Sequence, residues 1–577
     1  MSGRANKPED TQSVQFSNGD KVFVIEGTDE LKRWLDNHHH IKRMYSFVLL
    51  PELGSLVSWL GKEHVEAKYL GAQLRAHVTY RGFNCWFYDT RPLLNSFGLY
   101  KLEDCGEVVG TPKLDRPAWL GMRHWQNEQE HDGFVRYSGQ DALITSKIVG
   151  WLHENFGIDP AEYATSGTWS KTEFRLPRRL QLRKKTAIVP PLERMVKNIC
   201  FAGRSECFVN GYSPNVVYND VRSLYPTSIA ATRALEITGA VPCGEDEVVI
   251  GDPERFGWLE GVFETNNDMW GLPLRGKNNF YATGIITGLY HSFDLTAAKA
   301  KPVHIARTFK PTFTDDDKMH GKYVGLLISR LDGKMTEIEK MGAKALLNST
   351  YGKLGQAIPV IAPTSNFFAF STILAHSHFT MSRLFDACAT PILGTDTDSI
   401  FSPSDMSGKH FELTDGENSI PITLDVKGKG DLVYFRSKSY ILLNEDQQEQ
   451  LRNNQRVEGA VFGRHGWQYF KEDFFKLFDG TVTELHTRKD IKHTLSTREK
   501  EALKLEIGRW RTKPETLVLA KIKDLLKVDT KRMRDIYDSY GLVMSHKSAA
   551  SKAWPMNDIV EMQDDMLAYP RLVKKIA

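Results

Sequence analysis

The chain has 577 residues, of which 41% are hydrophobic and 25% are charged, and its formal net charge is only +3. This length is too great for one hydrophobic core and predicts several domains, while the composition excludes a disordered, collagen-like or coiled-coil protein. Because the net charge is small, nucleic-acid binding would have to depend on local basic patches.

Cysteine usage and the N-terminal sequence favour a reducing compartment. The six cysteines form no CxxC pair, so the sequence does not indicate a structural zinc cluster. Residues 1–12 are polar, and the most apolar early stretch, residues 45–60, is interrupted by Pro51 and Glu52. We therefore expect no signal peptide, no membrane partner and a cytosolic location.

The first 150 residues alternate strand-like and helix-like runs. Strands are expected at 21–25 and 83–88 and helices at 30–36 and 138–155, which predicts a mixed α/β domain. The next stretch, residues 165–195, is rich in arginine, lysine and proline. It has two open interpretations, a solvated linker or a surface that contacts phosphates.

Several further elements are expected after this basic stretch. They are, in chain order, a strand from Val216 that leads through a turn into a helix from Thr227, a stretch rich in Gly, Pro and aromatic residues at 241–320, a helical region at 321–354, a hairpin at 391–403, a strand at 432–443, and a charged helical region from Lys471 onward.

The first motif is the string Asp220-Val-Arg-Ser-Leu-Tyr-Pro226. A carboxylate at the end of a strand is held rigidly and can ligate a hard cation. The free backbone N–H groups of the turn that follows can hold a triphosphate. A simple helix-capping aspartate is the bland interpretation, but the string is long enough to be specific.

The second motif is Lys344-Ala-Leu-Leu-Asn348-Ser-Thr-Tyr351-Gly352. Residues four apart share a helix face, so Lys344, Asn348 and Gly352 form one stripe, with Tyr351 beside it. Such a stripe suits an incoming nucleotide, because lysine neutralises phosphate charge and glycine lets a base pair approach closely. A lone lysine stripe is usually a solvated face, and only the Asn-Ser-x-Tyr-Gly ending favours the functional interpretation.

The third motif is Gly394-Thr-Asp396-Thr-Asp398-Ser, with apolar flanks that predict a hairpin. In an extended chain Asp396 and Asp398 would point to the same side. Two carboxylates this close repel each other unless a cation lies near them. An acidic β-turn is the common alternative for this motif taken alone.

These three motifs, in this order, resemble the A, B and C motifs of family B DNA polymerases. Two further strings support the resemblance. Lys438-Ser-Tyr440 resembles the family's KxY element, which contacts the primer end, and Phe201-Ala-Gly-Arg204 resembles a degraded YxGG-type element, which touches template. The overall length and these strings look closest to the protein-primed branch found in phages, viruses and linear plasmids. The third motif departs from the family pattern, because Gly394 and Thr395 stand where a tyrosine and an apolar residue are frequent.

The resemblance implies an α/β multidomain fold, a right-hand polymerase of palm, fingers and thumb with an N-terminal RNase H-like domain of the exonuclease type. The implied domains are a degenerate exonuclease-like domain at 1–165, a basic linker at 166–205, the palm at 206–240 and 366–475, an insertion at 241–320, the fingers at 321–365, and a helical thumb and C-terminal region at 476–577.

The resemblance also implies two Mg²⁺ ions, with Mn²⁺ as a substitute, and a set of site residues. These are Asp220, Asp398, Asp396 and Lys344 for catalysis; Asp220, Asp398 and the Val221 carbonyl for metal; Val221, Ser223, Leu224, Tyr225, Lys344, Asn348, Tyr351 and either Arg330 or Lys334 for the nucleotide; and Phe201, Gly203, Arg204, Gly352, Lys438 and Tyr440 for DNA. In the family the ring at the position of Tyr225 lies under the sugar, which implies selection against ribonucleotides.

The implied activity is template-directed addition of deoxynucleotides to a primer 3′ end. The implied partners are primer-template DNA, deoxynucleoside triphosphates and a priming terminal protein or processivity factor, in the host cytosol if a phage or virus encodes the chain. The interval between the second and third motifs is short, which predicts weak processivity or strand displacement without a partner. Residues 241–320 are the implied docking region for a priming protein.

The family's exonuclease motifs are largely missing. No DxE string occurs near the N-terminus, the segment at 47–54 that matches the second motif contains Glu52 but lacks the expected Asn and Asp, and only Tyr137-Ser-Gly-Gln-Asp141 keeps the form of the third motif. We predict a degenerate exonuclease fold without proofreading. The alternative is that Glu52 and Asp89 substitute as metal ligands.

Two other functions stay open from the sequence. The first is a specialised polymerase for gap filling, lesion bypass or primer-independent synthesis. The second is an inactive polymerase-like scaffold that binds DNA, which retention of Asp220, Lys344, Asp396 and Asp398 disfavours. The SLYP and NSxYG strings speak against a reverse transcriptase.

Overall fold

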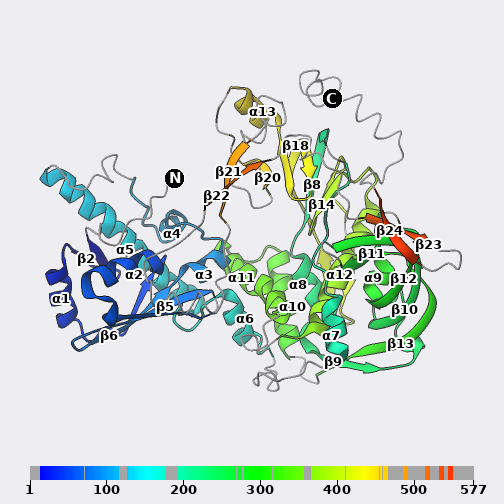
Figure 1. The fold of residues 1–577 in the computed structure, drawn as a ribbon, viewed down its shortest axis with the longest axis horizontal. Coiled ribbons are helices and arrows are strands. Elements are labelled where there is room, and N and C mark those ends of the chain that lie inside the picture. The colour runs from blue at the N-terminus through cyan, green and yellow to red at the C-terminus, as the bar shows by residue number, and fades with distance from the viewer. Residues whose placement is uncertain are drawn as a thin grey trace. The chain divides into compact units, whose positions relative to one another are not determined.

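The chain forms two compact units in the computed structural model, and each is described by itself (Figure 1). The units comprise Met1–Leu176, Met335–Thr350 and Lys492–Thr512 in the first, and Pro177–Lys334, Tyr351–Ile491 and Lys513–Ala577 in the second. The structure describes residues 13–70, 72–115, 127–176, 191–209, 211–267, 269–275, 279–314, 318–356, 365–409, 411–453, 455, 457, 459–464, 485–490, 514–519, 532–537 and 543–549.

The first unit is a mixed α/β domain. Its elements are β1 (Val14–Ser17), β2 (Val22–Ile25), α1 (Thr28–Asn37), β3 (Arg43–Ser46), α2 (Leu49–Leu60), β4 (Val65–Leu70), β5 (Gln73–Tyr80), β6 (Phe83–Asp89), α3 (Arg91–Leu94), α4 (Leu102–Val108), α5 (Glu128–Phe156) and α6 (Ser166–Glu173). This confirms the predicted strands at 21–25 and 83–88 and the helix at 30–36, with small differences at their ends, and the helix predicted at 138–155 begins earlier, at Glu128.

A four-stranded sheet in the order β3-β6-β5-β4 forms the centre of the first unit. β3 runs parallel to β6, and the other neighbours are antiparallel. Along β5 the buried residues Leu74, Ala76 and Val78 alternate with less buried ones, so one face of the sheet enters the core. Helices α1 and α2 pack on the sheet, and Leu31, Leu53 and other apolar residues of these helices join the same core.

The long helix α5 begins and ends at recognisable signals. The side chain of Asn127 accepts a hydrogen bond from the Glu130 N–H at 2.8 Å, which caps the N-terminus. Gly157 follows the last turn with φ of +64°, the left-handed conformation that favours glycine. α5 packs on β1, β2 and β3 and therefore fixes the position of Tyr137 and Asp141 on this unit.

The second unit contains two seven-stranded sheets and most of the long helices. Its elements are α7 (Pro191–Asn198), β7 (Ser205–Cys207), β8 (Gly211–Val221), α8 (Leu224–Ala231), β9 (Ile237–Pro242), β10 (Trp258–Thr265), β11 (Leu272–Arg275), β12 (Asn279–His291), α9 (Ser292–Ala297), β13 (Lys301–Phe313), α10 (Lys318–Leu331), the last turn of α11 (Glu337–Leu354), α12 (Phe367–Ala387), β14 (Gly394–Asp396), β15 (Ser399–Ser402), β16 (Phe411–Thr414), β17 (Ser419–Ile422), β18 (Leu424–Arg436), β19 (Ser439–Leu443), α13 (Glu445–Arg452), β20 (Val461–Arg464), β21 (Leu485–Asp490), β22 (Pro514–Leu519), β23 (Arg532–Tyr537) and β24 (Val543–Ala549).

One sheet brings the first and third motifs together. Its strand order is β20-β19-β18-β8-β15-β14-β7, and all neighbours are antiparallel. Its apolar face includes Val216, Leu393, Phe401 and Leu432, each almost without exposed surface. Asp220 therefore lies near the end of β8, and Asp398 lies in the turn that leads into its neighbour β15.

The other sheet, in the order β24-β23-β12-β10-β13-β9 with β11 paired to β12 as the seventh strand, curves around α9 and α12 (Figure 1). α12 is largely apolar around its whole circumference, as its burial requires. This sheet occupies much of residues 241–320, the stretch expected to be an insertion between the first two motifs.

The predicted helical region at 321–354 is confirmed and consists of two helices, α10 and α11, separated by residues 332–336. Two other expectations about secondary structure are wrong. The strand at 432–443 is a hairpin of β18 and β19 that turns at Lys438, whose φ is +60°. In the region expected to be a helical thumb, the described residues are the strands β21 to β24, and the rest of that region lies outside the described residues.

Two further findings concern the expected location and the basic stretch. In the part of the chain that the structure describes, no helix combines the length and apolarity that crossing a bilayer requires.

Helices α6 and α7 occupy the ends of the stretch at 165–195, and its basic centre, residues 177–190, lies outside the described residues.

Candidate active site

Two carboxylates meet where β8 and β15 pair. Ser399 lies opposite Asp220 in the antiparallel register, and the Val221 N–H donates a hydrogen bond to the Asp398 carbonyl oxygen at 2.7 Å. Burial, and then the negative charge of Asp220, raise the pKa of Asp398 to about 7. The pair therefore has the electrostatic strain that a bound cation relieves.

The chain reverses between the two aspartates of the third motif. Thr397 has φ of +69°, and the Asp398 N–H donates to the Asp396 carbonyl oxygen at 2.9 Å. The expected extended alternation across residues 396–398 is therefore wrong. The Thr397 N–H donates to the Arg204 carbonyl oxygen at 2.8 Å, which anchors this turn to the loop before β7.

Asp396 joins the third motif to the KxY-like element. Its carboxylate pairs with Lys438 Nζ at 2.6 Å and accepts a hydrogen bond from the Tyr440 hydroxyl at 2.9 Å. Spacing in the sequence does not predict these contacts, because they depend on the turn between β18 and β19. Asp396 thus positions Lys438 and Tyr440 beside the other carboxylates.

Charged side chains from β18 surround Asp220 and were missed from the sequence. Asp425 lies opposite Asp220 in the β18–β8 register, and Arg222 donates to it at 3.2 Å from Nε and 2.6 Å from Nη2. Lys427 Nζ lies 3.7 Å from Asp220 Oδ2 and 3.0 Å from Asp425 Oδ2. The alternation of Asp425 and Lys427 along a strand was the only available signal.

The side chain of Arg330 on α10 contacts the turn that follows Asp220. Ser223 adopts φ of +63° before α8, and Arg330 Nη1 donates a hydrogen bond to its hydroxyl oxygen. Lys334 pairs instead with Asp332 at 3.1 Å. The structure thus brings Arg330, and not Lys334, to the first motif. The Leu224 side chain is buried, so only its backbone can face a nucleotide.

Tyr225 connects three of the predicted site segments. Its ring stacks on that of Tyr351 with centroids 4.4 Å apart, and its hydroxyl accepts a hydrogen bond from the Gly203 N–H at 3.2 Å. A Cβ atom on Gly203 would approach Thr397 Cγ2 to 2.6 Å and the Tyr225 hydroxyl to 2.8 Å. Only glycine therefore fits between the first and third motifs at this point.

Lys344, Asn348 and Gly352, the remaining residues of the second motif, all lie on α11. Lys344 and Asn348 belong to the part of α11 that clusters with the first unit, and helical periodicity places both on the same face as Tyr351. A Cβ atom on Gly352 would meet nothing within 4 Å. The predicted contacts of Lys344, Asn348 and Gly352 with nucleotide or base pair stay predictions.

Arg204 has a structural position that differs from the expected contact with template. Its side chain is 1% exposed and pairs with Glu206 at 2.6 Å. The guanidinium also lies over the rings of Trp270 and Tyr281 and donates to the Met269 carbonyl oxygen. Phe201 is buried as well. In this string the exposed Ala202, the partly exposed Gly203 and the backbone remain as candidates to contact DNA.

The predicted exonuclease remnant, Tyr137 and Asp141 on α5, lies beside a lysine. Lys113 Nζ pairs with Asp141 Oδ2 at 3.1 Å and lies 5.8 Å from the centre of the Tyr137 ring. Asp141 Oδ1 is buried and has no hydrogen-bond partner among the described atoms. Burial raises the pKa of Asp141, while Lys113 lowers it.

Two more carboxylates lie near this remnant. Glu52 retains solvent-accessible surface, yet the burial of its carboxyl group and the charges of Asp89 and Asp141 raise its pKa. Burial raises the pKa of Asp89 to about 6, and the Arg91 N–H, which donates to it at 3.1 Å, opposes that shift. The proximity of these groups is the observation that favours Glu52 and Asp89 as substitute ligands, and the Lys113 pair is the one that opposes it.

The donor set beside Asp220 and Asp398 fits a hard cation in its chemistry. Carboxylate oxygens and a backbone carbonyl such as that of Val221 are the ligands that Mg²⁺ prefers. Within the described ranges, no group of three or more His, Cys, Asp or Glu side chains is arranged to hold a metal ion. The two aspartates are therefore a partial ligand set, which the Val221 carbonyl and substrate oxygens would complete.

The fold is similar to that of phi29 DNA polymerase, a likeness that agrees with the resemblance inferred from the motifs. It is similar to phi29 DNA polymerase complexed with primer-template DNA, with 16% identity, a TM-score of 0.51, and coverage of 79% of this chain and 89% of that chain. The ternary complex of phi29 DNA polymerase with primer-template DNA and incoming nucleotide substrates gives 15% identity, a TM-score of 0.51, and coverage of 73% and 82%. The sequence matches no protein-family model and no curated protein.

Gly394 explains the departure of the third motif from the family pattern. A Cβ atom there would overlap the ring of Tyr434, which is buried and donates from its hydroxyl to the Glu206 carbonyl oxygen at 3.3 Å. The tyrosine ring from β18 thus occupies the space that a larger residue at 394 would take.

We expect Gly394→Ala to destabilise the protein by about 1–3 kcal/mol, because the Tyr434 ring must move within a packed core. Thermal and urea unfolding measure this change. Gly325→Ala is the matched control, since Gly325 lies in α10 with open space around its Cβ position, and it should leave stability unchanged or raise it by up to about 1 kcal/mol. Equal stability of the two variants would contradict the packing described here.

Proposed function

We propose that the chain is a template-directed DNA polymerase that adds deoxynucleotides to the 3′ end of a primer. The observation that carries the proposal is the register of β8 and β15, which sets Asp220 and Asp398 side by side at the end of a buried sheet. The similarity of the fold to phi29 DNA polymerase supports it. We assign the sheet with β8 and β15 to the palm, and α10 and α11 to the fingers.

Asp220 and Asp398 would hold two Mg²⁺ ions, with Val221 contributing its carbonyl oxygen. The ions, when bound, supply positive charge at the attacking and leaving oxygens of the transferred nucleotide. The protein's contribution is rigid placement of the two carboxylates, because phosphoryl transfer depends on position and charge rather than on covalent help. Lys427 and Arg222 keep the net charge around Asp220 and Asp425 close to balance.

The triphosphate would lie over the turn between β8 and α8. Arg330 already points to Ser223 there, and burial together with the positive charge of Arg222 lowers the pKa of Arg330. The guanidinium groups of Arg222 and Arg330 lie close together beside the carboxylate of Asp425. Their combined positive charge would stabilise an anion bound between them. Lys344 would bind the same triphosphate and protonate the leaving pyrophosphate, and Asn348 and Tyr351 would line the pocket for the new base pair.

The primer end would lie against the turn between β18 and β19. Lys438 is half exposed and bound to Asp396, so its ammonium is positioned at the rim of the site and accessible to a phosphate. Tyr440 is fixed by the same carboxylate. Asp396 would therefore act as a positioning residue, whereas Asp220 and Asp398 would touch the reacting groups through metal.

Asp398→Asn should lower extension of a primed template by about 10²–10³-fold or more, because it removes a charged ligand from the pair. Gel-resolved primer extension with Mg²⁺ measures the rate. Asp386→Asn is the matched control, since Asp386 is an exposed aspartate of the same unit that pairs with Lys299 at 2.9 Å. Extension by Asp398→Asn at the control's rate would refute the proposed activity.

Tyr225→Ala should raise ribonucleotide incorporation relative to deoxynucleotides by roughly tenfold or more, because the ring that would meet a 2′-hydroxyl is gone. Tyr225→Phe keeps the ring and loses only the hydrogen bond from Gly203, so it should discriminate nearly as the wild type does. Competing incorporation of both nucleotide types on one template gives the ratio. Unchanged discrimination by the alanine variant would exclude Tyr225 from this role.

We propose that the first unit lacks proofreading activity. The support is that Lys113 occupies a position beside Asp141 that a metal ion would require. We expect labelled single-stranded DNA to remain intact with Mg²⁺ and the purified protein. Degradation that Asp141→Ala or Glu52→Gln abolishes would instead establish the alternative ligand set of Glu52, Asp89 and Asp141.

A second candidate function is a specialised polymerase for gap filling, lesion bypass or primer-independent synthesis. The Lys113–Asp141 pair favours it, because loss of proofreading is tolerable when synthesis is short. Extension assays with gapped, lesion-containing and unprimed templates separate it from replication. A priming terminal protein or a processivity factor remains a proposed partner, with the sheet of β9 to β13 as its proposed docking region.

A further inference from the structure

Strand β18 carries an extra residue at the point where it passes the first motif. The antiparallel pairing of β18 with β8 is irregular between Val426 and Gly428. These two residues lie opposite Asn219 and Tyr218, which are neighbours in β8, so Lys427 is the extra residue of a bulge. Bulges are over-represented next to active sites, where they change the direction of a side chain.

The ammonium group of Lys427 lies beside two carboxylates. Its Nζ atom is 3.7 Å from Asp220 Oδ2 and 3.0 Å from Asp425 Oδ2. Arg222 also binds Asp425, with a hydrogen bond of 3.2 Å from Nε and one of 2.6 Å from Nη2. Asp425 is thereby fixed in place, and it holds the lysine next to the aspartate that we assign to metal binding.

The charges of these four side chains already balance. Asp220 and Asp425 contribute two negative charges, and Arg222 and Lys427 contribute two positive ones. A divalent cation at Asp220 therefore gains less than it would from a carboxylate without a neighbouring ammonium group. The Lys427 side chain is 45% exposed, so water screens the repulsion between the two cations. Even in bulk water, an ammonium group about 4 Å from a divalent ion lowers the affinity for that ion by roughly tenfold.

We propose that Lys427 sets the affinity of the candidate active site for divalent cations, because its ammonium group competes with the incoming ion for Asp220. The inference rests on the proposed function, since it takes Asp220 and Asp398 as metal ligands. A lysine side chain is flexible, so its head group can move away when an ion binds. Metal would then bind tightly only when substrate oxygens add to the ligand set.

A second lysine of β18 provides the comparison that the inference needs. Lys429 pairs with Asp405 at 2.7 Å, and its side chain is 60% exposed. Exposed ion pairs such as these contribute little to the stability of a fold. The two lysines therefore differ mainly in their partners, because Lys427 reaches a proposed metal ligand and Lys429 pairs with a carboxylate outside the proposed ligand set.

The test measures Mn²⁺ binding by the full chain without nucleotide or DNA, from the electron paramagnetic resonance signal of the free ion. The difference between each protein and its Asp398→Asn counterpart gives the binding at the candidate active site. We expect Lys427→Met, which keeps the length of the side chain and removes its charge, to tighten this binding by about tenfold. Lys427→Arg keeps a cation and should bind Mn²⁺ within about threefold of the wild type.

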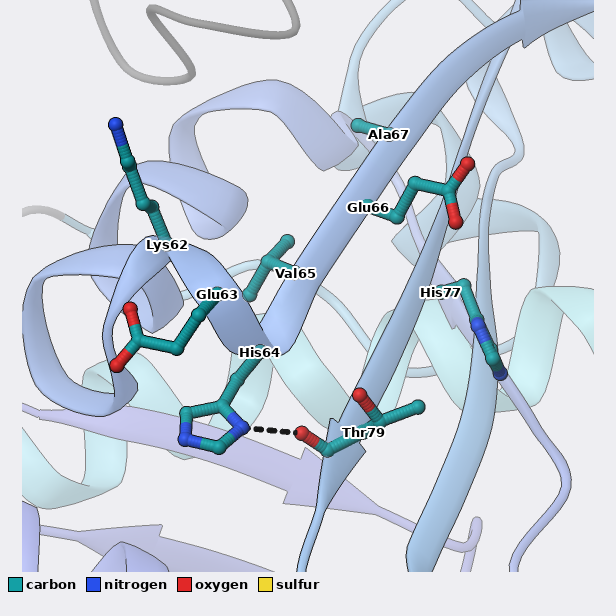
Figure 2. A pocket seen from close by; sticks show the side chains of 8 residues that line it. All are labelled: Lys62, Glu63, His64, Val65, Glu66, Ala67, His77 and Thr79. Atoms are coloured by element: carbon teal, nitrogen blue, oxygen red, sulfur yellow. Dashed lines mark hydrogen bonds between the residues drawn. The ribbon is translucent and has the colours of Figure 1, made fainter.

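Taking the difference also removes Mn²⁺ that binds elsewhere on the chain. One such place is a hollow of about 260 Å³ on the first unit, where Glu63, His64, Glu66 and His77 are among the lining residues (Figure 2). Carboxylate and imidazole groups bind Mn²⁺ weakly even where they do not form a complete site. Ions held there are present in both members of each pair of proteins and therefore cancel.

Lys429→Met is the matched control, because it removes the same charge two residues further along β18. It should leave Mn²⁺ binding at the candidate active site within about twofold of the wild type, since exposed charges farther away are screened. An equal gain in Lys429→Met would reduce the effect to net charge and overturn the inference. Unchanged or weaker binding by Lys427→Met, with wild-type binding intact, would overturn the inference alone. No Asp398-dependent binding in any of these proteins would refute the metal assignment, and the inference with it.

Discussion

The antiparallel register of β8 and β15 is the constraint on which the candidate active site depends. A slip of one residue would move every side chain of a strand to the opposite face and would separate Asp220 from Asp398. Several contacts fix this register. The rings of Tyr218 and Phe401 meet at 4.6 Å, and the buried amide of Asn219 donates to the Ser404 carbonyl oxygen at 2.9 Å and accepts from the Met406 N–H at 2.9 Å.

The electrostatics of the site follow from this register. A buried carboxylate next to another is costly in a medium of low dielectric constant, and the cost falls when cations approach. The chain provides these cations from separate elements, with Lys427 on β18, Arg330 on α10 and Lys438 at the β18–β19 turn. Each is close to an oxygen atom of the first or third motif, so the site presents negative charge at its centre and positive charge at its rim.

The sequence was sufficient to predict the motifs, the strand that ends at Asp220 and the class of fold, because these depend on local patterns of residues. It was not sufficient where tertiary contacts decide. The turn at Thr397 needs a positive φ that the residue type does not announce, and Arg204 could be placed in the core only once its partner Glu206 and the surrounding rings were known. The C-terminal strands were missed because the local charge pattern resembled that of a solvated helix, and pairing with distant strands overrode it.

Arg204 connects the sheet that contains β12 with the turn between β14 and β15 of the other sheet. Its guanidinium is held by Glu206 and the Tyr281 ring, while its carbonyl oxygen accepts from the Thr397 N–H at 2.8 Å. Heat that loosens β12 around Tyr281 would therefore disturb the turn that carries Asp398 before the sheet itself melts. The proposed activity would then be lost at a lower temperature than the one at which the chain unfolds, and a lysine at 204, which lacks the planar fork, would widen that interval.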